Sequence, residues 1–415
     1  MEPSIALTIG AAILIIGFMA DEIHLRFGVP DILALIFLGA LFGPVLGIIP
    51  RDPLMSLAPY FAALTLAIVL FESGINFPIT KSFSETPRAI LYAFLGVVLS
   101  TLFLTPAASL IFSWSPLEAA LLGVIVGGTS SAIVLPLVQR MRVSGSAKDI
   151  LRLESILTDG IIVVIAMLIL RLLTIPTLSI TVEIVSREII GSIMLSLIIG
   201  FAAALLLSRI IASAQKKLYG DIMILGLVVL IYAVSEQIGG NGALTTFIFA
   251  LTLRNVKQLM PWLRSMGSPT DKDLKQVVES AEERMPSFKF YSRKFYAQIS
   301  FLMRTYFFAF LGMIFCIPSP DIFLIGISLT MMLLAARYLS TYLIGIKSTL
   351  SKRDKFLMSL ICGRGLAAAV LASLIISYGL ETLAVIQELT TQIIIYTSII
   401  SALAAYLSEK KKLLR

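Results

Sequence analysis

Long apolar windows recur along almost the whole chain, and they restrict its fold more than any single motif does. Stretches of about 18 residues or more with few charged side chains are long enough to cross the roughly 30 Å hydrocarbon layer of a membrane as helices. Hydrophobic residues make up 58% of the 415 residues and charged residues 14%, which is too apolar for a soluble domain of this length. The apolar and polar alternation of a membrane barrel does not occur. The sequence therefore predicts an all-α polytopic membrane protein.

About 13 transmembrane helices are expected from these windows. We expect residues 1–415 to form a single transmembrane domain without a soluble regulatory domain. The predicted spans cover approximately residues 4–21, 29–49, 56–77, 88–113, 116–139, 150–172, 188–211, 218–238, 241–256, 296–317, 319–343, 355–379 and 385–408.

Basic residues predict the orientation of these spans. With the tail Lys410–Lys412 in the cytoplasm, an odd number of crossings places the N-terminus outside. The outer segments then carry only Arg51, Arg171 and Arg187, as the positive-inside rule requires. The net charge of +8 is explained by this topology, so we do not expect nucleic-acid binding.

Other features of the chain limit its chemistry. Residues 257–294 are expected to form a cytoplasmic connector containing an amphipathic helix, and the single histidine, His24, is expected to be exposed in a short inner loop. No phosphate-binding loop or dinucleotide fingerprint occurs, so we expect no cofactor. Any transport must therefore be driven by ion gradients.

The predicted spans divide into two groups of six separated by a linker helix. Repeat one covers about residues 1–175, the linker about 188–211 and repeat two about 218–408, and the two repeats would have opposite topology. Corresponding spans are interrupted alike, at residues 127–131 and at residues 363–365. Interrupted helices expose main-chain carbonyl groups at mid-membrane, where they can coordinate a dehydrated cation.

Two carboxylates lie inside the sixth predicted span, Glu154 and Asp159. An acidic residue at the centre of a membrane helix costs roughly 2.5–3.5 kcal/mol on insertion scales, which favours an ion or proton pathway over a buried pair that only fixes helix register. At 100° per residue the two side chains point about 140° apart. Asp159 shares a face with Ser155, and we expect this face to meet Thr129 and Ser130 in the first interruption.

Glu154 needs a different partner because it points away from that face. Arg364, in the second interrupted span, is the expected one. Removing one partner of such a buried pair would be strongly destabilising, so the role of Glu154 and Arg364 is expected to be structural.

Four motifs together resemble the cation/proton antiporter superfamily, and most of all its branch of NhaP-type sodium/proton antiporters. They are the run from Arg26 to Pro44, Glu154-Ser155-x-x-Thr158-Asp159, the stretch from Arg304 to Gly312, and Gly363-Arg364-Gly365. The resemblance covers nearly the whole chain. It implies a sodium/hydrogen-exchanger-type transmembrane domain that forms a homodimer in the cell membrane and works by elevator-type alternating access.

The resemblance also implies a set of site residues. Asp159 would bind cation and proton in turn, with further cation or proton ligands at Ser155, Thr129, Ser130, Thr158 and Glu72. The metal ligands proper would be Asp159, Ser155, Thr129 and Glu72, holding Na⁺ or K⁺. Glu154 and Arg364 would be the stabilising ion pair of the family.

Two departures from the pattern of that branch affect the expected stoichiometry. Thr158 stands where an asparagine is usual, and Thr129-Ser130-Ser131 stands where Thr-Asp-Pro is usual. Neither substitute carries charge, which favours electroneutral exchange of one cation for one proton. Glu72 and Asp159 remain as the acidic ligands, with Na⁺ favoured and K⁺ as the alternative.

Competition for one carboxylate is a sufficient mechanism for such exchange. Burial disfavours the ionised form of Asp159, so a proton and a cation compete for it, and the empty charged site is costly to move across the membrane. The alternatives from other classes are a sodium-coupled organic solute symporter of the same fold, and a cation pathway or pore subunit that works with partner proteins.

Overall fold

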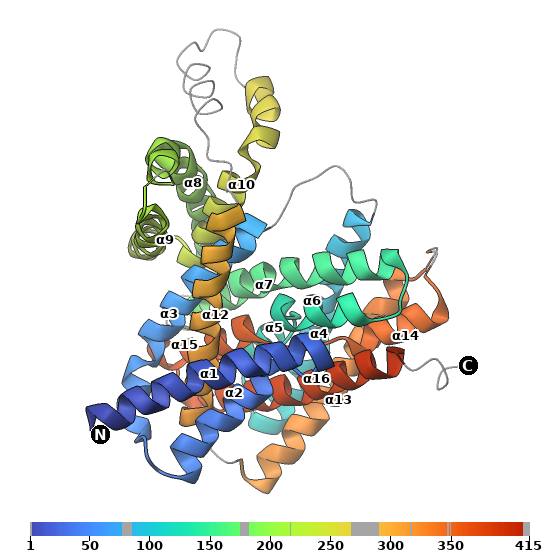
Figure 1. Cartoon of the computed structure of the whole chain (residues 1–415). Helices are drawn as coiled ribbons and strands as arrows, with labels where there is room; N and C mark the ends of the chain where they lie inside the picture. The colour runs from blue at the N-terminus through green and yellow to red at the C-terminus, as the bar shows by residue number, and fades with distance from the viewer. Residues whose placement is uncertain are drawn as a thin grey trace. The chain divides into compact units, whose positions relative to one another are not determined.

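The computed structural model describes residues 2–76, 85–174, 182–215, 217–266, 290–315, 318–346, 348 and 350–409 (Figure 1). Helices account for all regular secondary structure in these ranges, and no strand occurs within them. The prediction of an all-α protein is thereby confirmed.

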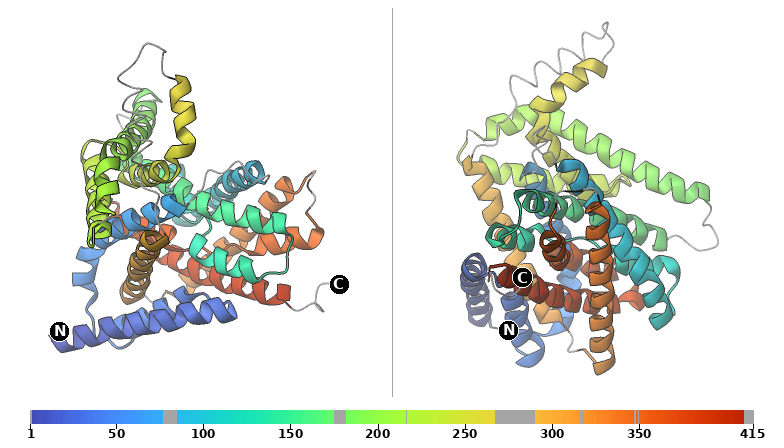
Figure 2. Two further views of the ribbon diagram at one scale, coloured as in Figure 1. Left: turned by 45° about the horizontal axis from the view of Figure 1, so that its top comes forward. Right: turned by 90° about the vertical axis from the view of Figure 1, so that its right-hand side faces the viewer.

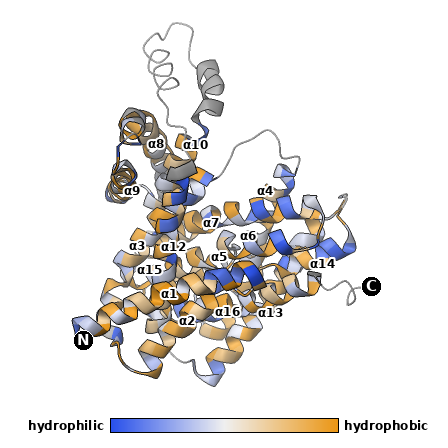
Figure 3. Ribbon diagram, viewed as in Figure 1, coloured by the Kyte–Doolittle hydropathy of each residue, from blue (hydrophilic) through white to orange (hydrophobic). Residues whose placement is uncertain are grey.

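Nine helices of the described residues contain a stretch long and apolar enough to cross a membrane. Apolar residues dominate most of these helices, while polar residues gather near helix ends such as that of α14 (Lys352–Leu360) (Figure 3). The chain is therefore a polytopic membrane protein. The nine are α1 (Pro3–Phe27), α3 (Arg51–Asn76), α4 (Thr86–Phe112), α7 (Gly145–Thr174), α8 (Val182–Ala214), α9 (Gly220–Gln237), α12 (Phe290–Ile314), α13 (Pro320–Ile344) and α16 (Val385–Glu409).

The remaining helices are shorter or less apolar. The total of about 13 crossings and the two inverted repeats stay predictions. The connector also stays a prediction, because residues 267–289 lie outside the described residues. These remaining elements are α2 (Asp31–Ala40) with its π-helical continuation Leu41–Val45, α5 (Pro116–Ile125), α6 (Ser131–Arg140), α10 (Gly242–Met266), α14, α15 (Leu366–Leu374) and two 3₁₀ turns, Ile376–Tyr378 and Glu381–Leu383.

Two predicted spans are interrupted, as the glycine-containing motifs suggested. Residues 126–130 separate α5 from α6, and residues 361–365 separate α14 from α15. The leading half-helices start in the same way: Ser115 and Glu118 form a capping box at α5, and Ser351 and Asp354 form one at α14. Each box satisfies two main-chain donors at a helix start. The capping residues thus fix where each half-helix begins.

The described chain divides into two compact units, and the first contains every interrupted helix. This unit comprises Met1–Ala63, Phe83–Pro176 and Arg304–Arg415. Within it α4 packs against α5, α7 and α13, and α16 packs against α6, α13, α14 and α15. These contacts bring the two interrupted helices and the acidic helix α7 into one bundle.

The second unit comprises Leu64–Ser82 and Thr177–Met303. Its helices α8, α9 and α10 lie side by side (Figure 2). Phe71, from the later half of α3, packs its ring edge-on against Tyr296 with 5.1 Å between ring centroids and stacks on Phe249 at 6.1 Å. This aromatic group is part of an apolar core to which α3, α8, α9, α10 and α12 contribute.

A crossing of α2 and α12 in the first unit depends on glycine. A Cβ atom on Gly39 would clash with the main-chain oxygen of Ala309, and one on Gly312 would clash with the main-chain oxygen of Ile36. The two backbones therefore approach closely only because neither position carries a side chain. Both glycines belong to the motifs singled out in the sequence.

Candidate functional site

The two interruptions meet through their main chains. The N–H group of Ser130 donates a 2.9 Å hydrogen bond to the carbonyl oxygen of Gly363. A Cβ atom on Gly365 would collide with the side chain of Ser130, and one on Gly363 would lie 2.7 Å from Ile133 Cγ2. Non-helical backbone is therefore packed against non-helical backbone, which satisfies polar groups that the helix breaks would otherwise leave unpaired.

Asp159 lies on α7 opposite the start of α6. Its side chain is 9% exposed, and its Oδ2 atom accepts a 2.8 Å hydrogen bond from Ser131 Oγ and a 3.4 Å one from Ser131 N–H. Ser131 is the first residue of α6, so this N–H group is one of the free donors at the positive end of the helix dipole. Within the described residues, no cationic side chain forms an ion pair with Asp159. Neutral donors alone hold this carboxylate.

Thr129 faces the other carboxylate of α7. Its hydroxyl group donates to Glu154 and lies 2.9 Å from both carboxylate oxygens. Its N–H group donates to Thr158 Oγ1 at 3.1 Å, and Thr158 Oγ1 lies 3.1 Å from the carbonyl oxygen of Thr129. Thr129 and Thr158 therefore fasten the first interruption to α7 and to Glu154. We expected Thr129 to contact the face of α7 that carries Asp159. In the structure Ser131 contacts Asp159 instead.

The predicted pairing of Glu154 with Arg364 is wrong, because Glu154 is bound by Arg337 of α13. Arg337 Nη1 lies 2.8 Å from Glu154 Oε1, and Arg337 Nη2 lies 3.0 Å from Glu154 Oε2. Both side chains are almost completely buried. Arg337 Nη2 also donates to the carbonyl oxygen of Ile361, and the guanidinium lies over the ring of Tyr92 with 4.3 Å to its centroid. This bidentate, buried ion pair thus links α7 and α13 to α4 and to the second interruption.

Arg364 is fully buried as well but is held differently. Its main-chain N–H group donates to Thr397 Oγ1 at 3.1 Å, which anchors the second interruption to α16. Its Nε and Nη1 atoms have no hydrogen-bond partner in the described part of the chain. Arg337 and Arg364 both fall within predicted spans, residues 319–343 and 355–379, so only three-dimensional packing could choose between them.

The other predicted site residues fall into three groups. The hydroxyl group of Ser155 donates to the carbonyl oxygen of Arg152 at 3.0 Å, within its own helix. Ser130 belongs to the crossing through its main chain. Glu72 belongs to the second unit, so its proposed contribution to the Asp159 site stays a prediction. Ser131 was part of the motif that marked the interruption but was not predicted to contact Asp159.

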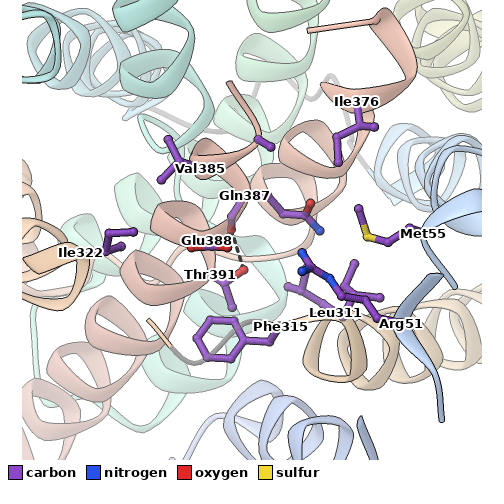
Figure 4. Close-up of a pocket in the computed structure, with 12 residues that line it drawn as sticks. Arg51, Met55, Leu311, Phe315, Ile322, Ile376, Val385, Gln387, Glu388 and Thr391 are labelled. Atoms are coloured by element: carbon purple, nitrogen blue, oxygen red, sulfur yellow. Dashed lines mark hydrogen bonds between the residues drawn. The ribbon is translucent and has the colours of Figure 1, made fainter. Parts of the chain in front are cut away.

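A cavity of about 340 Å³ lies elsewhere in the first unit (Figure 4). Arg51 and Glu388 both line it, together with Gln387, Thr391 and apolar side chains that include Phe315. None of the predicted cation ligands contributes to its wall. The cavity therefore does not mark the Asp159 site.

Comparison with known proteins places this arrangement in context. The family described as "Sodium/hydrogen exchanger, transmembrane" matches residues 10–406. The chain is 24% identical over 400 residues to Na(+)/H(+) antiporter 1 of Methanocaldococcus jannaschii, covering 92% of this chain and 85% of that protein. It is 26% identical over 251 residues to K(+)/H(+) antiporter NhaP2 of Shewanella sp. (strain ANA-3), covering 60% of this chain and 43% of that protein.

The fold has a counterpart among solved structures. The sodium proton antiporter MjNhaP1 from Methanocaldococcus jannaschii, determined at pH 8, aligns with a TM-score of 0.72 over 99% of this chain and 97% of that chain, at 21% sequence identity. The match to NhaP2 is shorter: this chain spans less than half the length of that relative.

Proposed function

Because this chain belongs to the family of sodium/hydrogen exchangers, whose match covers residues 10–406, we propose that it exchanges a monovalent cation for a proton across the membrane, with Asp159 as the shared binding group. One observation carries the assignment to Asp159. It is a buried carboxylate on a membrane helix that accepts hydrogen bonds from the hydroxyl and N–H groups of Ser131 and pairs with no cationic side chain of the described residues. Such a group can accept either a proton or a metal ion.

The chemistry of the site follows from what each group can accept. When Asp159 is ionised, the donors of Ser131 stabilise its negative charge. A cation replaces the proton only when the carboxylate is free, so each ion excludes the other. Carboxylate, hydroxyl and carbonyl oxygens are hard ligands suited to Na⁺ or K⁺. The loaded, neutral forms cross the membrane, since moving an uncompensated charge is costly.

The further ligands are proposed as Ser155, Thr129, Ser130, Thr158 and Glu72. The hydrogen bonds observed at Thr129 and Ser155 leave lone pairs on oxygen, because a carbonyl or hydroxyl oxygen has two. Both oxygens can therefore still contact a cation. In this proposal Asp159 remains the ligand whose charge changes during exchange.

We propose Na⁺ as the favoured cation, K⁺ as the alternative, and a ratio of one cation to one proton. The relatives include one named for Na(+)/H(+) exchange and one named for K(+)/H(+) exchange. The ratio rests on Asp159 being a buried carboxylate of α7 with no ionic partner in the described chain, whereas the buried Glu154 is paired with Arg337. A homodimer in the cell membrane, elevator-type movement, an outer N-terminus and a cytoplasmic C-terminus complete the proposal.

The proposal is tested by Asp159→Asn in proteoliposomes that carry a pH-sensitive dye. We expect cation-dependent dissipation of a pH gradient in the wild type and at least a hundredfold loss in the variant, because asparagine cannot bind and release a proton. Asp149→Asn, on the same helix but nearer its start, serves as the matched control and should exchange normally. Full activity of Asp159→Asn would overturn the assignment.

A cation panel with the membrane potential clamped by an ionophore gives selectivity and stoichiometry together. Electroneutral exchange is expected to be insensitive to the clamp. Sodium uptake that depends on an organic solute and responds to voltage would instead indicate a symporter, and current without coupled proton movement would indicate a cation pathway.

A further inference from the structure

His24 is the single histidine of the chain, and it is buried. We expected it in an exposed loop, but α1 continues to Phe27 and leaves only 1% of His24 accessible. Neither ring nitrogen has a hydrogen-bond partner of regular geometry in the described chain. A buried imidazole needs at least one acceptor for its N–H group, and two when it is protonated.

The charges around His24 leave room for one more positive charge. Asp21, one turn earlier on α1, and Asp31, at the start of α2, both contact Arg304 Nη2 of α12 at 3.2 Å. These two carboxylates and one guanidinium sum to a net charge of −1. A protonated His24 beside them would bring the cluster to neutrality. The two carboxylates therefore favour proton binding at this position, against the cost of burying a charged ring and the charge of Arg304.

The helix opposite His24 is α6. The backbone of Ala132 is close enough to His24 to act on it electrostatically, and α1 packs against α6. Pro136 lies four residues after Ala132 and has no N–H group, so the carbonyl oxygen of Ala132 lacks its usual donor within the helix. The charged side chain of α6 is Arg140, whose Nη1 lies 3.5 Å from where a Cβ would stand on Gly28.

We propose that His24 is a second proton-binding site, and that its protonated ring ties α6 to the charged cluster of α1, α2 and α12. One ring N–H group would face the carboxylates of Asp21 and Asp31, and the other would donate to Ala132. Ala132 follows Ser131, the residue that donates to Asp159. A proton on His24 thus restrains the half-helix that holds the ion-binding carboxylate.

The consequence is that acid slows exchange in a way distinct from competition at Asp159. This inference rests on the proposed function, because it assumes that α6 moves during exchange. Competition changes the cation concentration needed for half-maximal rate and is overcome by excess cation. A restrained α6 lowers the maximal rate itself, and excess cation does not restore it.

The kinetic test compares maximal rates at saturating cation at two pH values that bracket the titration of an imidazole. If the restrained form does not exchange, the wild type should lose about tenfold in maximal rate at one pH unit below the midpoint, where about nine in ten rings are protonated. His24→Gln, which cannot be protonated, should retain its rate. Glu22→Gln is the matched control, since Glu22 pairs with Arg26 at the exposed side of the same helix, and it should behave as the wild type.

A spectroscopic test is independent of transport. A single histidine gives one set of imidazole signals in protein purified without a histidine tag, and these signals should titrate between about pH 5 and pH 8. A ring that does not titrate overturns the proposal, as does an equal acid loss of maximal rate in His24→Gln. A wild type without any exchange overturns the proposed function as well, whereas exchange with an unaltered His24→Gln profile overturns this inference alone.

Discussion

The two buried carboxylates of α7, Glu154 and Asp159, lie five residues apart and have opposite surroundings. Glu154 accepts hydrogen bonds from Nη1 and Nη2 of Arg337 and from the hydroxyl group of Thr129. Among the described residues, Asp159 accepts hydrogen bonds only from Ser131, at 2.8 Å from its hydroxyl group and 3.4 Å from its N–H group. A charge that is fully paired becomes part of the framework, whereas a charge held by neutral donors can be exchanged for a proton. The contrast supports the proposal that Glu154 is structural and that Asp159 binds the exchanged ions.

The largest effect on stability is expected when the ion pair between Arg337 and Glu154 is broken. Arg337→Met leaves a buried carboxylate without its counter-charge and should cost about 3–5 kcal/mol of stability. Reversible unfolding in mixed micelles measures this loss. The double variant Arg337→Met with Glu154→Gln should recover most of it, because no unpaired charge then remains. A single variant as stable as the wild type would contradict the structural role of the pair.

The next effect is expected at Asp159, the proposed ion-binding carboxylate. Ser131→Ala removes the hydroxyl donor from Asp159, and hydrogen bonds to charged groups contribute about 1.5–3 kcal/mol. A proton then competes more effectively with the cation, so the cation concentration for half-maximal exchange should rise by about tenfold or more. Rates measured over a range of cation concentrations at constant pH test this. The overall stability should change much less than in Arg337→Met.

Thr129→Val should affect stability by about 1 kcal/mol, since it removes one hydrogen bond from Glu154 but leaves Arg337 in place. The main-chain carbonyl group of residue 129 is retained, so the half-maximal cation concentration should stay near that of the wild type. A large loss of cation affinity would show that the hydroxyl group of Thr129 serves Asp159 after all.

Ser155→Ala should have the smallest effect. Its hydroxyl group donates only to the carbonyl oxygen of Arg152 in its own helix, so the fold should lose less than about 0.5 kcal/mol. If Ser155 is a cation ligand as proposed, the half-maximal cation concentration should nevertheless rise by about two- to fivefold. Parallel measurements of stability and cation dependence separate the two roles.

The interruptions of the helices could be predicted because glycine-rich runs carry a local signal. Residues 127–131 and 363–365 both interrupt otherwise apolar spans. Residues 127–130 and 363–365 lie in non-helical segments of the structure, and Ser131 begins α6. Helical periodicity also predicted different partners for Glu154 and Asp159, and their partners do differ, although Thr129 contacts Glu154 and not Asp159 as expected. These inferences needed only neighbouring residues and the geometry of a single helix.

The partners across the fold could not be predicted in the same way. Arg337 is 183 residues from Glu154, and nothing local distinguishes it from Arg364. Helical periodicity does not extend through an unwound segment, which explains why Ser131 rather than Thr129 meets Asp159. The prediction of an exposed His24 is wrong because α1 continues to Phe27, beyond the predicted end near residue 21, and His24 is buried within this helix.

The tie between Ser130 and Gly363 has a consequence for how such a chain can diverge. Since it uses only peptide groups, almost any replacement of the surrounding side chains leaves it intact, and homologues can drift in ion preference while the junction persists. Two kinds of replacement are exceptions: proline at position 130, because it deletes the N–H group, and a side chain at position 363 or 365, because it would collide with Ile133 or Ser130. Replacing that amide by an ester through chemical synthesis would be the direct way to weaken the junction without altering a side chain.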